Sequence, residues 1–174
     1  MLGLVPVGTA VSADAAPSVE ARHVAVAPCR GSQLIGNFSL VRDSEGAGNV
    51  TYALELINRS RSTCSVTGLP EMQLLAVSGR LLPTHVSLAR IGRLAPLLLV
   101  LAHGDVAWAS ARFSPDVPGV GERTLGPCEA TASRVRVSSR SPDSAVVLPV
   151  RPPTPVCEHG SMSVSVLGRV RPTS

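Results

Sequence analysis

Short segments in which hydrophobic and polar residues alternate recur along the whole chain. The clearest spans 50–58, where Tyr52, Leu54 and Leu56 fall on one side of an extended strand. A period of two residues is typical of a half-buried β-strand, and no segment has a convincing 3.6-residue helical period. The strand candidates, separated by segments rich in Gly, Pro, Asn and Ser, are 22–27, 33–41, 50–58, 72–78, 86–88, 97–102, 106–113, 134–138, 145–150 and 162–167.

This spacing of short strands predicts an all-β fold. We expect an antiparallel immunoglobulin-like (Ig-like) β-sandwich of about eight or nine strands. The only tryptophan, Trp108, lies between Cys64 and Cys128 in the second half of the chain, so the likeness to antibody domains is one of architecture only. Residues 151–155 contain three prolines, which lack the N–H that a central strand needs. That segment is therefore predicted to be an extended crossover or a protected edge.

The length of 174 residues suits a single domain, which we place at 22–170. Residues 1–16 precede it and resemble a signal-peptide remnant, with an apolar run and an A-x-A cleavage pattern at 13–15. The basic start of a signal peptide is missing, so a disordered leader is the alternative. No transmembrane segment is predicted, because the longest apolar stretch, 94–102, falls far short of the roughly 20 residues that a spanning helix needs.

The four cysteines, Cys29, Cys64, Cys128 and Cys157, are widely spaced and form no CxxC motif. Such spacing argues against a zinc or thioredoxin-type motif and favours structural disulfides formed in an oxidising compartment. Three pairings are possible. We prefer Cys29–Cys64 with Cys128–Cys157, because each bridge then closes one sequence-local lobe. The alternative is a cytosolic protein with four buried free thiols.

Composition narrows the range of functions. Hydrophobic residues make up 44% of the chain and charged residues 16%, which is too apolar for intrinsic disorder. Aromatic residues make up only 2%, which disfavours an aromatic-lined pocket and a base-stacking platform. The chain contains no lysine, so Schiff-base, Walker-lysine and Ser–Lys chemistry are excluded. The net charge is +4 and comes from arginine.

No motif in the chain indicates catalysis. The G-x-S-x-G nucleophile elbow is absent, and His103-Gly104-Asp105 is better explained as a hairpin turn than as part of a catalytic group. The glycines in 46–48 and 119–121 lack the third glycine of a dinucleotide fingerprint and are interpreted as turns. We therefore predict no catalytic residue, no cofactor and no enzymatic activity.

One pair of residues offers a metal-binding alternative. His159 and Met162 are three residues apart near Cys157, and such ligands suit Cu(I). The alternative function is thus a periplasmic or extracellular copper-binding protein using His159 and Met162. The simpler interpretation, which we prefer, is a histidine in a turn and a methionine that points into the core.

A group of arginines indicates a candidate binding surface for a partner. Arg134 and Arg136 share one strand face near Arg140 and Arg151, a face that suits anionic cell-envelope polymers or lipid headgroups, or simply solvent. Another protein, paired along an edge strand, is a further candidate partner. Nucleic acid is not expected, because no stacking aromatics lie among these cations.

Several short motifs together resemble the secreted, mainly actinobacterial family known as domain of unknown function 4232. The likeness extends over about 28–170, although 139–142 lacks the Pro-Pro-Gly turn expected in this family. The motifs are Cys29-Arg30, Leu34, Gly46-Ala47-Gly48, Tyr52, Leu54-Glu55-Leu56-Ile57-Asn58-Arg59-Ser60, Cys64, Gly68-Leu69-Pro70, Gly79, His103-Gly104, Cys128, Arg134-Val135-Arg136-Val137 and Val156-Cys157.

This resemblance implies a secreted or lipid-anchored β-sandwich with two disulfides and no established activity. Asn58 would hydrogen-bond its own backbone at a strand end, and Gly68 and Pro70 would turn the chain into the next strand. No lipobox cysteine is visible, so release or non-covalent envelope association is expected. We therefore expect an exported, non-enzymatic envelope-associated binding or structural module. A small hydrolase whose site the sequence does not reveal is a further alternative.

Overall fold

The computed structural model describes residues 26–89, 98–139 and 142–173. The predicted leader at 1–16, most of the strand candidate 22–27 and Arg140 lie outside the described residues. The domain prediction of 22–170 therefore begins before the part of the chain that is described.

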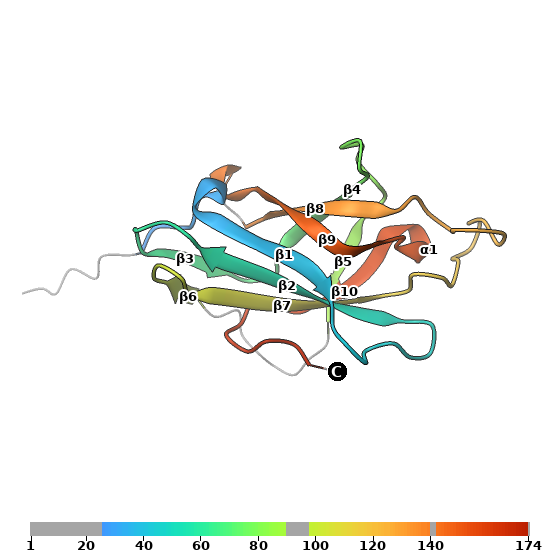
Figure 1. The fold of residues 1–174 in the computed structure, drawn as a ribbon, viewed down its shortest axis with the longest axis horizontal. Coiled ribbons are helices and arrows are strands. Elements are labelled where there is room, and N and C mark those ends of the chain that lie inside the picture. The colour runs from blue at the N-terminus through green and yellow to red at the C-terminus, as the bar shows by residue number, and fades with distance from the viewer. Residues whose placement is uncertain (1–25, 90–97, 140–141, 174) are drawn as a thin grey trace, which may run out of the picture.

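The described residues form ten strands and three short helical turns (Figure 1). Nine of the strand candidates overlap these strands, whereas β3 was not predicted. In chain order the elements are η1 (Gly31–Gln33), β1 (Leu34–Leu40), β2 (Val50–Asn58), β3 (Cys64–Thr67), β4 (Glu71–Leu75), β5 (His85–Leu88), β6 (Leu98–Leu101), β7 (Val106–Phe113), β8 (Ala132–Ser138), η2 (Pro142–Ser144), β9 (Val146–Thr154), α1 (Cys157–Gly160) and β10 (Ser161–Val164).

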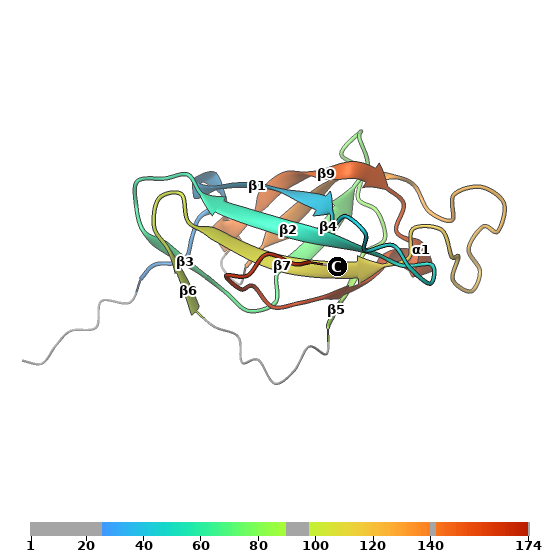
Figure 2. The ribbon, with the colours of Figure 1, turned by 60° about the horizontal axis from the view of Figure 1, so that its bottom comes forward.

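The all-β prediction is confirmed, but the arrangement differs from an antiparallel Ig-like sandwich. Eight strands form one sheet in the order β4-β8-β9-β1-β2-β7-β10-β5, and β3 and β6 form a separate pair. The large sheet is nearly closed and barrel-like (Figures 1 and 2). Two pairings, β1 with β9 and β10 with β5, are parallel.

The core lies inside this curved sheet and is built on the alternation of β2 and β7. The side chains of Tyr52, Leu54 and Leu56 are buried, as the sequence pattern predicted. Tyr52 lies 5.1 Å from Phe38 and 5.1 Å from Phe113, measured between ring centroids. Three of the four aromatic side chains thus form one core cluster, which leaves only Trp108 to serve an outer surface.

The prediction for 151–155 is wrong in part, because β9 continues through Thr154 in the middle of the sheet. The prolines are accommodated because, in the described ladders, Pro152 and Pro153 pair with neither β1 nor β8. The pairing with β1 ends at Arg151, and the pairing with β8 has a register shift before Thr154. The strand β3 was missed for a simpler reason: it is only four residues long and follows directly on the polar segment 59–63.

Candidate functional site

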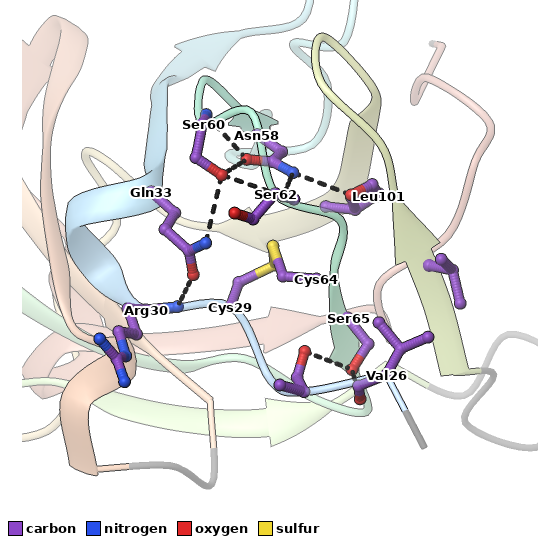
Figure 3. Close-up of a disulfide and its surroundings, with 12 residues drawn as sticks. Val26, Cys29, Arg30, Gln33, Asn58, Ser60, Ser62, Cys64, Ser65 and Leu101 are labelled. Carbon is purple, nitrogen blue, oxygen red and sulfur yellow. Dashed lines mark hydrogen bonds between the residues drawn. A yellow bond between two sulfur atoms is a disulfide. The ribbon is translucent and has the colours of Figure 1, made fainter. Parts of the chain in front are cut away.

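The first disulfide lies beside a buried asparagine (Figure 3). Cys29 and Cys64 are bonded with their Cα atoms 4.8 Å apart, and the bridge ties the segment before η1 to β3. A backbone hydrogen bond joins the same two segments, since the amide of Cys29 donates to the carbonyl of Ser65 at 2.8 Å. The predicted pairing is confirmed, and its role is to hold the N-terminal edge of the domain.

Asn58, at the end of β2, is fully buried and uses its whole side-chain amide. Its Oδ1 accepts from the amide and the hydroxyl of Ser60, at 2.9 and 2.8 Å (Figure 3). Its Nδ2 donates to the carbonyls of Ser62 and Leu101, at 2.9 and 2.8 Å. The predicted local hydrogen bonding is confirmed. The bond to Leu101, which ties β2 to β6, was not anticipated because it joins segments 43 residues apart.

Gly68 and Pro70 occupy the turn that carries the chain from β3 into β4, as predicted. Gly68 has a φ of 78°, in the left-handed region that favours glycine. Its carbonyl accepts from the amide of Leu167 at 2.9 Å, and Pro70 is buried. Both residues therefore serve the scaffold and do not form a ligand site.

The second disulfide, Cys128–Cys157, is also confirmed, with a Cα–Cα distance of 5.6 Å. It precedes a left-handed turn in which Glu158 and His159 have φ values of 54° and 58°. The Glu122 carboxylate stabilises this turn by accepting hydrogen bonds from the amides of Gly119, Glu158 and His159. Desolvation raises the pKa of Glu122, but the three amides and the charge of His159 together lower it below its usual range.

The copper hypothesis finds no support in this arrangement. Met162 is 2% exposed and belongs to the hydrophobic core, whereas the side chain of His159 is 55% exposed. The neighbours of His159 are carboxylates: its Nδ1 lies 3.5 Å from Glu122 and 3.9 Å from Glu129. Because Glu122 is already engaged by three backbone amides, this cluster is explained by its structural role.

A hollow lies on the outer face of the sheet. We call it the β7–β10 groove: its floor is formed by outward-facing residues of β7 and β10, and its volume is about 790 Å³. This is within the range of roughly 300–1,000 Å³ typical of small-molecule sites. The lining residues are Thr51, Leu88, Ala89, Leu99, Trp108, Ala109, Ser110, Arg112, Ser163, Ser165, Val166, Leu167, Gly168, Arg169, Val170, Arg171, Pro172 and Thr173.

The C-terminal segment forms one wall of the β7–β10 groove. Beyond β10 the chain continues along β7, where Trp108 and Gly168 exchange two backbone hydrogen bonds of 2.8 Å. The last described residues then turn back in front of β7 (Figure 2). Large apolar side chains stay open to solvent here, with Leu88 57% and Val170 83% exposed. Apolar surface therefore remains uncovered in the groove.

Three arginines line the groove, and the described lining contains no carboxylate. Arg169 forms an ion pair with Asp105 at 3.2 Å, and the guanidinium carbon of Arg171 lies 5.3 Å from the centroid of the Trp108 ring. The backbone amide of Ala102 and the guanidinium of Arg169 lower the pKa of Asp105, which keeps that pair ionised. The side chain of Arg112 is exposed, and within the described residues its guanidinium has no hydrogen-bond or ion-pair partner.

The arginines singled out from the sequence lie elsewhere. Arg134 donates to the carbonyl of Val77 at 2.8 Å, and Arg136 is exposed on the same strand, β8. Sequence reasoning missed the groove arginines because they come from separate segments. The available signal was the outward alternation of Trp108, Ser110 and Arg112 along β7.

Among the described residues, no helix has the length and hydrophobicity needed to cross a membrane. No curated protein and no solved structure matches the chain. Residues 29–168 match the family described as Domain of unknown function (DUF4232). The match begins at the first cysteine and includes both disulfides, Asn58 and the strands that form the groove floor. The chain therefore belongs to the DUF4232 family.

Proposed function

We propose that this protein is an exported, non-enzymatic binding module of the cell envelope, and that its ligand occupies the β7–β10 groove. The observation that carries the proposal is a hollow of about 790 Å³ with exposed apolar residues in its walls. The two disulfides support export, because such bridges form and persist in oxidising compartments. The leader-like pattern of residues 1–16 points the same way.

Binding is favoured over catalysis by the chemistry of the groove lining. The described lining holds apolar side chains, hydroxyls and guanidinium groups, but no His, Cys, Asp or Glu. Proton transfer at neutral pH usually relies on one of those four residue types. The hydroxyl of Ser165 accepts from the amide of Ser110 at 2.9 Å, so it has a structural role. The groove is thus suited to holding a molecule without transforming it.

Filling the groove tests this proposal. We expect the uncharged apolar probe N-phenyl-1-naphthylamine to bind the purified protein saturably, with one probe per chain. Ser110→Phe places a ring on the groove floor and should weaken probe binding at least about tenfold, because the apolar volume that receives the probe is lost. The measurement is a titration followed by the fluorescence of the probe.

The matched control is Ser133→Phe, which makes the same change on β8 outside the groove lining. It should leave the affinity for the probe unchanged. Absence of saturable binding, or equal weakening by Ser110→Phe and Ser133→Phe, would contradict the proposed site.

A further inference from the structure

Polar side chains on the groove floor gather in one row. Arg112 of β7 pairs in register with Thr51 of β2 and with Ser163 of β10. Residues directly opposite one another in a sheet project from the same face, and all three line the β7–β10 groove. Within the described residues, the guanidinium and the two hydroxyl groups have no hydrogen-bond or ion-pair partner. This polar row therefore presents unused donors to a molecule in the groove.

Much of the remaining lining is apolar, although the hydroxyls of Ser110 and Ser165 also belong to it. Trp108 lies four residues before Arg112 on the same face of β7, at a distance of about 13 Å along an extended strand. Leu88, Val166 and Val170 also line the groove. A ligand that fills the groove would meet hydrogen-bond donors at the polar row and mainly apolar side chains toward Trp108, whose ring lies 5.3 Å from the guanidinium carbon of Arg171.

The charged side chains in the groove indicate whether its ligand is an anion or a cation. Arg169 is engaged by Asp105, and Arg171 lies over the Trp108 ring. Arg112 retains its full donor set, and its planar fork suits the two oxygens of a carboxylate or a phosphate. The described lining holds three guanidinium groups and no carboxylate, so its charge favours an anion.

We propose that the groove binds an anionic amphiphile, with its carboxylate or phosphate head on Arg112, Thr51 and Ser163 and its hydrocarbon tail extending toward Trp108. This inference rests on the proposed function, since it names the ligand class of the same site. A single acyl chain with one anionic head meets both requirements. Fatty acids and phospholipids share this chemistry and differ in the head group, carboxylate or phosphate, that the test compares.

The test is a set of calorimetric titrations with ligands of one chain length, each kept below its micellar concentration. We expect dodecanoate or dodecyl phosphate to bind more tightly than dodecanol, and dodecyltrimethylammonium to bind more weakly than dodecanol. Acetate and inorganic phosphate, which have no tail, should show no measurable binding. A preference between the two anions would identify the head group as carboxylate or phosphate.

The decisive variant is Arg112→Gln, with Arg136→Gln on the exposed face of β8 as the matched control. Arg112→Gln should weaken binding of the preferred anion by about 10- to 100-fold, the loss expected for a charged hydrogen-bonding partner. It should leave dodecanol binding unchanged, and Arg136→Gln should change neither. A second variant, Thr51→Val with Ser163→Ala, removes the hydroxyls and should weaken only the anion.

Two outcomes would overturn the inference while leaving the proposed function intact. One is equal affinity for dodecanol and both anions. The other is an unchanged anion affinity in Arg112→Gln. If neither dodecanol nor the anions bind saturably, the proposed function itself fails. Saturable binding of dodecanol and the anions with equal affinity would overturn only the anionic ligand class. The absence of any saturable binding would overturn the proposed binding function.

Discussion

Replacing Cys29 and Cys64 together with serine should lower the free energy of unfolding by about 4 kcal/mol. The bridge spans 35 residues of sequence, and in the chain-entropy description a loop of this length restricts the unfolded chain by about that amount. Loss of the bridge also loosens the backbone bonds that hold the N-terminal segment on β3. Urea denaturation at pH 7, analysed by linear extrapolation, measures this difference.

The second bridge provides a comparison within the same chain. Cys128→Ser with Cys157→Ser opens a span of 29 residues and should cost nearly the same. The two closed segments do not overlap in sequence, so the two losses should be close to additive. A loss smaller than about 1 kcal/mol for Cys29→Ser with Cys64→Ser would contradict the stabilising role assigned to that disulfide.

The second large effect is expected at Asn58. Asn58→Asp preserves shape but replaces the donor that serves the carbonyls of Ser62 and Leu101 with a carboxylate oxygen. It buries a negative charge opposite two carbonyl oxygens, and an uncompensated buried charge costs about 3–5 kcal/mol. We expect a loss of that size at pH 7, measured by urea denaturation against the wild-type protein.

The loss in Asn58→Asp should depend on pH with a defined sign. Burial among carbonyls raises the pKa of the new carboxyl in the folded state above its unfolded value. The protonated acid regains one donor, so the deficit should be smallest below the unfolded pKa and should grow as pH rises through the folded pKa.

Asn49→Asp is the matched control for Asn58→Asp. Asn49 is half-buried in the turn between β1 and β2, where its amide makes one exposed hydrogen bond to the Ala47 carbonyl. That change should cost less than about 1 kcal/mol at any pH. Equal losses in the two variants would contradict the buried network described for Asn58.

Local features of the fold were predictable because their causes are local. Alternation along 50–58 and 106–113 predicts β2 and β7, since a strand with one buried face must place its apolar residues at every second position. The turns at Gly68 and at 103–105 follow from the backbone preferences of glycine and aspartate. The disulfide pairing followed from the preference for bridges that close local lobes.

The closed sheet and the groove could not be predicted, because they depend on contacts between distant segments. The parallel pairing of β5 with β10 places Leu88 beside Val164, and this brings the end of β5 to the groove. No periodicity within either segment indicates that neighbour. The His159 and Met162 pair failed for a related reason: spacing of three residues does not reveal that one side chain points to solvent and the other into the core.

In the proposed complex, the β7–β10 groove holds the hydrocarbon tail of its ligand near Trp108. Trp108 is the only tryptophan, so its emission reports on the groove alone. Bromine quenches tryptophan only at short range, and 11-bromoundecanoate carries it at the end of its tail. We predict saturable quenching of Trp108 with one ligand per chain, and no quenching by undecanoate. Quenching that never saturates, or that equals the collisional quenching of N-acetyl-tryptophanamide at the same concentration, would contradict ligand binding in the β7–β10 groove.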